Sequence, residues 1–109
     1  MSFAARFEPD TRARLRAHLM KRGHQLATLL SEVLAGKRPP ALDALLTAKP
    51  GLRPEEAVRL ALDQVEAQRR LLDAGDDRYG RCAVCDEDLG LPALGELPWA
   101  DRCRAHAAR

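Results

Sequence analysis

The residue types that favour β-strands are nearly missing from this chain. Its 109 residues include no Ile, four Val and four aromatic residues, against 19 Ala and 18 Leu. Strands favour β-branched and aromatic residues, whereas Ala, Leu, Arg and Glu favour helix. The length fits one small domain and is too short for a two-domain enzyme. The sequence therefore predicts a mainly α-helical protein and excludes an all-β fold or a large parallel sheet.

A first long helix is predicted over residues 10–35. Asp10 and Thr11 are both suitable N-cap residues after Pro9, and Gly36 followed by Pro39 is a natural stop. Its apolar residues recur at helical spacing and form one stripe: Leu15, Leu19, Leu26, Leu30 and Val33.

A second long helix is predicted over residues 54–74, since Pro54 suits a first helical turn and Gly75 follows the last. Its stripe is formed by Val58, Leu62, Val65 and Leu72. Packing of one stripe on the other predicts an antiparallel hairpin. Arg22 and Arg69 fall near the contact positions, which favours a short helix pair over a long coiled coil.

The connection between these helices, residues 36–53, is too long for a tight loop. Pro40 and Pro50 bound a stretch, residues 41–48, that is long enough for two helical turns. We expect a short helix there, at the tip of the hairpin, with three leucines covering its open end: Leu42, Leu45 and Leu46. We expect one structural unit with a helical hairpin over residues 1–75 and a metal-binding module over residues 76–109.

The two ends of the chain differ in charge. Residues 1–38 hold eight Lys and Arg against three Asp and Glu, whereas residues 76–109 hold five against seven. The basic first third is suited to nucleic acid or to an acidic protein surface, and a solvated helix face is the alternative. The N-terminus lacks the apolar run of a signal peptide, and no apolar stretch approaches a membrane span. We therefore expect a cytoplasmic protein, with no membrane contact, in a compartment that disfavours disulfides.

The last third of the chain carries two pairs of metal-ligand residues. Cys82 and Cys85 are separated by two residues, and so are Cys103 and His106 further along. Two such pairs, with an interval in the high teens between them, fit a tetrahedral Zn²⁺ site. Four protein ligands leave no open position, so the sequence predicts one structural zinc ion.

We also expect a short final helix that opens at Pro98 and carries Cys103 and His106 on one face. Three alternatives to the zinc site stay open: a finger without metal in which His106 is a surface residue, a redox-active Cys pair, and iron in place of zinc. We interpret His18 and His24 as surface or boundary residues. No Ser-His-Asp set, phosphate loop or carboxylate pair is recognisable, so we expect no enzyme activity.

The C-terminal third resembles the DksA/TraR family of bacterial zinc-finger transcription regulators. The resemblance covers residues 75–106 and depends on Tyr79-Gly80-Arg81-Cys82-Ala83-Val84-Cys85, on Leu89-Gly90 and on Pro98-Trp99-Ala100-Asp101-Arg102-Cys103. His106 stands where many members have Cys. Active members carry a D-x-x-D-x-A motif at the hairpin tip, and the corresponding region of this chain offers only Asp43.

The resemblance implies a helical hairpin ahead of a zinc finger, and RNA polymerase as the partner. Family members pass the hairpin into the secondary channel of the polymerase and alter promoter complexes, some together with the alarmone ppGpp. Candidate partner-binding residues are Arg12, Arg16, Asp43, Arg69 and Arg70. The alternatives are a zinc-finger adaptor or homodimer that uses the apolar tip, and a non-specific nucleic-acid binder. The low aromatic content argues against sequence-specific DNA recognition.

Overall fold

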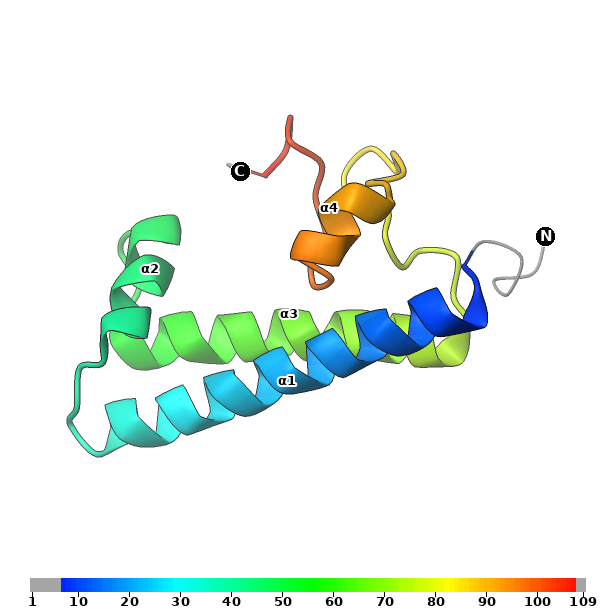
Figure 1. Cartoon of the computed structure of the whole chain (residues 1–109). Helices are drawn as coiled ribbons and strands as arrows, with labels where there is room; N and C mark the ends of the chain where they lie inside the picture. Colours follow the sequence, from blue (N-terminus) through cyan, green and yellow to red (C-terminus); the bar gives the residue numbers. More distant parts are fainter. Residues whose placement is uncertain (1–6, 108–109) are drawn as a thin grey trace.

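The two long helices lie side by side and antiparallel in the computed structural model (Figure 1). α1 spans Pro9–Leu34 and α3 spans Pro54–Ala74, so both predicted ranges are confirmed to within one residue. The structure describes residues 7–107, and the ends of the two predicted parts, residues 1–6 and 108–109, lie outside the described residues. No strand is assigned within the described residues.

The start of α1 differs from the expected N-caps. Glu8 is the N-cap and Pro9 the first helical residue, while Asp10 lies in the first turn. The fixed φ of proline suits the first helical position, where its missing N–H costs no hydrogen bond, so the helix begins there.

Glycine ends both long helices in the same way. After α1, Gly36 has a φ of 84°, and the N–H of Lys37 donates to the Glu32 carbonyl at 2.9 Å. After α3, Gly75 has a φ of 68°, and the N–H of Asp76 donates to the Leu71 carbonyl at 3.0 Å. These are Schellman endings, which require a residue that tolerates the left-handed conformation.

The core of the hairpin contains most of the two predicted stripes, together with Leu29, which the predicted stripe of the first helix did not include. The large or branched apolar side chains buried from its helices are Leu15, Leu19, Leu26, Leu29, Leu42, Val58, Val65 and Leu72. Three stripe residues, Leu30, Val33 and Leu62, are only partly buried at its edge. α1 passes close to α3 at Gly23, where an added Cβ would lie 3.6 Å from Cγ1 of Val65.

The expected tip helix is α2, which spans Pro40–Ala48. Leu42 is 1% exposed, and Leu45 and Leu46 pack against the core. α2 stands out from the hairpin on the same side of α3 as the C-terminal module, residues 76–107 (Figure 1).

The predicted final helix at Pro98 is wrong. The short helix of the C-terminal module is α4, Leu91–Glu96, and residues 98–107 form turns. The carbonyls of Pro98, Trp99 and Asp101, which a helix would use internally, accept hydrogen bonds from other parts of the chain. Tertiary contacts thus replace the helix.

No helix among residues 7–107 combines the length and the apolar character needed to cross a membrane.

Candidate metal centre

The structure brings the four predicted ligands together. The Sγ atoms of Cys82, Cys85 and Cys103 and a ring nitrogen of His106 all lie within 4.8 Å of one another. The Cys85 and Cys103 sulfurs are 3.7 Å apart, and Nδ1 of His106 lies 3.6 Å from the Cys82 sulfur and 3.1 Å from the Cys103 sulfur. All three cysteines are free thiols. This group is compatible with one bound metal ion.

A tight turn after α3 holds the first ligand pair. The N–H of Cys82 donates to the Glu87 carbonyl at 2.8 Å, and the N–H of Asp86 donates to the Cys82 carbonyl at 2.9 Å. The N–H of Val84 points at the Cys82 sulfur, 3.4 Å away. Asp86 takes a φ of 63°, a conformation that Asp tolerates better than most residues. The backbone therefore directs both sulfurs to one side.

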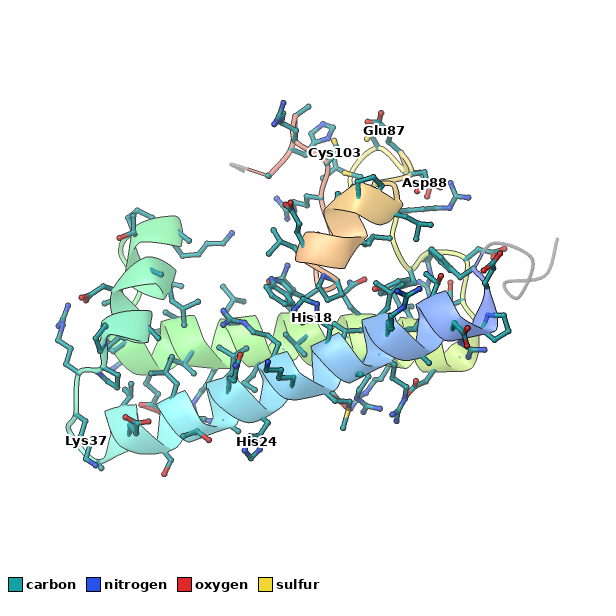
Figure 2. The ribbon with its side chains drawn as sticks, in the orientation of Figure 1. His18, His24, Lys37, Glu87, Asp88 and Cys103 are labelled. Carbon is teal, nitrogen blue, oxygen red and sulfur yellow. The ribbon has the colours of Figure 1, made fainter. Side chains whose placement is uncertain are left out.

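The second ligand pair is tied to the first by the backbone. The N–H of Ala83 donates to the Asp101 carbonyl at 2.7 Å, which places the chain that leads to Cys103 beside the first turn. The N–H of His106 then donates to the Cys103 carbonyl at 3.0 Å and turns the imidazole toward the sulfurs. Cys103 lies with the exposed Glu87 and Asp88 on the side of the module that is remote from α1 and α3 (Figure 2).

Two thiols of the site differ in acidity. Desolvation disfavours the Cys82 thiolate, but the backbone N–H groups of Cys103, Cys85 and Val84 together outweigh it and lower the pKa of Cys82 to about 6. At Cys85 the backbone N–H of Glu87 stabilises the thiolate, yet desolvation and the neighbouring thiols raise the pKa of Cys85 above its usual value. Metal binding would displace the remaining protons, so affinity depends on pH.

Trp99 attaches the module to the hairpin. Its ring meets the His18 ring edge-on at 5.5 Å, and the Arg22 guanidinium carbon lies 5.0 Å from its centre. Nε2 of Gln64 donates to the Trp99 carbonyl at 3.1 Å and to a carboxylate oxygen of Asp101 at 3.2 Å. Because Trp99 and Asp101 lie four and two residues before Cys103, the segment that leads to the metal cluster is also the one that contacts the hairpin.

Sequence reasoning missed this junction. Arg22 falls on the apolar stripe of α1, which is the signal that its guanidinium faces another part of the chain. His18, interpreted as a surface or boundary residue, lies on the side of α1 toward the module, whereas His24 lies on the opposite side (Figure 2). His18 and Trp99 are too far apart in sequence for helical spacing to predict their contact.

The candidate partner-binding arginines pair mainly within the chain. Arg12 donates to the carbonyls of Leu72 and Asp73 at the end of α3, and Nε of Arg16 lies 2.9 Å from the Asp73 carboxylate. Arg69 pairs with Glu66 and Asp73, and Arg70 pairs with Glu66. Arg12 and Arg16 thus join α1 to α3, whereas the ion pairs of Arg69 and Arg70 lie within α3. Asp43, at the tip, lies 3.5 Å from Arg38.

No protein-family model matches this sequence, and neither a curated protein nor a solved structure matches it.

Proposed function

We propose that this chain is a cytoplasmic, non-catalytic regulator that holds one structural Zn²⁺ and acts by binding RNA polymerase. The observation that carries the proposal is the cluster of Cys82, Cys85, Cys103 and His106 in a small module that follows a helical hairpin. The resemblance to DksA/TraR regulators supplies the partner.

The donor set and two separations within the cluster support zinc as the metal. With Zn–S and Zn–N bonds of about 2.3 and 2.05 Å, a tetrahedral site separates two sulfurs by about 3.8 Å and a sulfur from a nitrogen by about 3.6 Å. The Cys85–Cys103 separation is 3.7 Å and the Cys82–His106 separation is 3.6 Å. The shorter Cys103–His106 separation, 3.1 Å, is that of a thiol–imidazole hydrogen bond, which a bound metal would replace. Three thiolates and an imidazole form a common structural zinc site.

The residues that carry the resemblance also have roles in folding the module. Tyr79 is fully buried, and its hydroxyl donates to the Pro98 carbonyl at 2.9 Å. The Asp101 carbonyl accepts the Ala83 N–H between the two ligand pairs. The motif therefore corresponds to a set of contacts that builds the finger, which supports reading it as more than a chance match of spacing.

The hairpin tip differs in charge from the family's acidic tip. Residues 36–53 contain Lys37, Arg38, Lys49 and Arg53, against Asp43 as their one acidic residue. We therefore propose that this protein binds the polymerase without the acidic contact that active members make at their tip.

Two alternative functions receive less support. Leu42 is already buried within its own chain, so it supplies no surface for a homodimer. Of the five cations in residues 12–22, Arg12 and Arg16 bind α3 and Arg22 lies against Trp99. That leaves Arg14 and Lys21 as a small basic surface for nucleic acid.

Metal analysis of the purified protein tests the zinc assignment. We expect about one zinc ion per chain, and His106→Ala should bind it more weakly. Undiminished zinc affinity in that variant would remove His106 from the site, and iron in place of zinc would contradict the assignment.

Binding to purified bacterial RNA polymerase tests the function. We expect the polymerase to retain the zinc-loaded protein, and promoter-complex lifetime to change in a transcription assay with and without ppGpp. Cys82→Ser, which loses a ligand but keeps every charge on the hairpin, is the matched control. No retention of the wild-type protein at low salt would refute the proposed function.

A further inference from the structure

The segment that carries the second ligand pair has no helix to shape it. Residues 98–107 form turns, so the position of this pair relative to the first depends on hydrogen bonds from other parts of the chain. Within the module, the Tyr79 hydroxyl donates to the carbonyl of Pro98 at 2.9 Å. The N–H of Ala83 donates to the carbonyl of Asp101 at 2.7 Å. Further bonds to the same segment come from the hairpin.

Gln64 of α3 donates its side-chain amide to this segment. Its Nε2 lies 3.1 Å from the Trp99 carbonyl oxygen and 3.2 Å from a carboxylate oxygen of Asp101. A carbonyl and a carboxylate only accept, so the amide nitrogen alone can serve both, with one N–H for each. Both bonds are partly buried, where water competes less for the donor and the acceptors. The hairpin therefore binds the chain two residues before Cys103.

Asp101 connects the hairpin with both ligand pairs. Its carboxylate accepts from Gln64, and its carbonyl accepts the N–H of Ala83, which lies inside the first pair. A shift of Asp101 would change the distance between the pairs. A tetrahedral zinc ion fixes that distance through bonds of about 2.3 Å to sulfur. The ion and Gln64 therefore favour the same placement of Asp101.

Trp99 gives the segment a second attachment, to the other helix. Its ring lies edge-on to the His18 ring at 5.5 Å, and the Arg22 guanidinium carbon is 5.0 Å from its centre. Both of these side chains belong to α1. Trp99 is only partly buried against the hairpin core, so its contacts can be lost while the two helices stay packed.

We propose that zinc binding is coupled to the docking of the module on the hairpin, with Gln64 as the positioning residue. The inference rests on the zinc ion of the proposed function and is independent of its partner. Gln64 binds the segment in the arrangement that the ion fixes, so each event favours the other by the same factor. A residue of the hairpin that is not a ligand thus raises the zinc affinity of the module.

Gln64→Met tests the coupling. Methionine has a similar length and helix propensity but no N–H donor, so this change removes both hydrogen bonds and preserves α3. The dissociation constant for Zn²⁺ is measured by competition with a chelator of known affinity. We expect it to rise about tenfold. Gln25→Met, the same change at an exposed position of α1, is the control and should leave the constant unchanged.

A pair of histidine variants repeats the test from α1. His18→Ala removes the ring contact with Trp99 and should raise the zinc dissociation constant about threefold. His24→Ala is the control, because His24 is exposed and lies on the opposite side of α1 (Figure 2). The proposal is overturned if Gln64→Met and His18→Ala bind zinc as tightly as their controls do.

The metal-free protein separates positioning from a general role in folding. The contact forms with the zinc-loaded module, so metal-free Gln64→Met should lose its helical circular dichroism at the same urea concentration as the metal-free wild type. A hairpin that is destabilised in step with the loss of zinc affinity contradicts the proposal, because Gln64 would then act on the fold of α3.

Trp99 reports the docking itself. It is the single tryptophan of the chain, and its fluorescence should change over the same zinc concentrations at which the metal is bound. In Gln64→Met that change should need about tenfold more free zinc. Zinc uptake that leaves the Trp99 fluorescence unchanged would show that binding and docking are independent, which also refutes the coupling.

Binding to RNA polymerase is scored separately. If the zinc affinity depends on Gln64 and the polymerase does not retain the wild-type chain, the proposed function fails and the coupling stands. If the polymerase retains the chain and Gln64→Met binds zinc as tightly as Gln25→Met, the coupling fails and the proposed function stands.

Discussion

The hairpin and the C-terminal module are held together by different means. The hairpin, Pro9–Ala74, buries eight large or branched apolar side chains between its helices. In the module, residues 76–107, the buried side chains are Tyr79, Cys82, Leu94, Pro98 and Cys103, of which two belong to the candidate metal cluster. A segment of this size has too few apolar side chains to fold without a staple. The hairpin is therefore held by packing, whereas we expect the module to depend on a bound metal.

Metal removal has the largest expected effect, and it should act on one region. Structural zinc contributes about 10–16 kcal/mol to small domains that bind it. We expect chelation, or Cys82→Ser, to unfold the module while α1 and α3 keep their helical circular dichroism. The fluorescence of Trp99 should shift as its contacts with His18 and Arg22 are lost. Loss of the helical signal together with the metal would contradict the prediction, because the hairpin and the module would then unfold as one cooperative unit.

A core truncation should act on the other region. Leu19 is fully buried between α1 and α3. Leu19→Ala should lower the free energy of unfolding by about 2–5 kcal/mol, because it leaves a cavity that the helices fill only in part. Urea denaturation measures this, and metal analysis should find the zinc content unchanged. Leu34→Ala, at a position that is 58% exposed, is the control and should cost less than about 0.5 kcal/mol.

A substitution at Gly23 is expected to stabilise the hairpin, whereas the core truncation destabilises it. Gly23 lies inside α1, where glycine costs about 0.5–1 kcal/mol relative to alanine. An added Cβ would lie 3.6 Å from Val65, which is ordinary van der Waals contact. Gly23→Ala should therefore stabilise the hairpin by about that amount, measured by thermal unfolding. Destabilisation would mean that the helices need a closer approach than the structure gives them.

Substitution of Asp76, at the boundary between the two regions, is expected to have the smallest effect on stability. The side chain and then the backbone N–H of Arg78 lower the pKa of Asp76 from 3.8 to about 2. A lowered native pKa means that the carboxylate stabilises the fold above about pH 4 and that this contribution is lost as the pH falls toward 2. Asp76→Asn should therefore be less stable than the wild type at neutral pH.

The difference in the free energy of unfolding between Asp76→Asn and the wild type should disappear as the pH falls from about 4 toward 2. The measurement uses zinc-loaded protein, because the module that contains Asp76 is expected to unfold without the metal, and the zinc content is followed at each pH because acid displaces zinc. A difference in the free energy of unfolding that does not change with pH would contradict this prediction, because the effect would then come from the amide side chain and not from the lost charge.

Local patterns were sufficient to predict α1, α2 and α3 and the four residues of the candidate metal cluster, but not α4. Pro9, Pro54 and the glycines after each long helix act within one or two turns, and so does the spacing of Leu15 and Leu19. The ligand spacing is equally local within each pair. The final helix was predicted from the same kind of signal at Pro98, and it failed because Gln64, Tyr79 and Ala83 take the carbonyls that would have closed it.

The sequence alone thus determined a helical hairpin and a set of three Cys and one His, because helix signals and paired ligands act over a few residues. Only the tertiary structure decided that Trp99 lies on His18 and Arg22, and that Arg12 and Arg16 bind α3. It also decided that α2 and the module face each other across a groove on α3. These features depend on contacts between residues that are distant in sequence. The spacing of residues along one helix does not indicate which distant residues its outer face will contact.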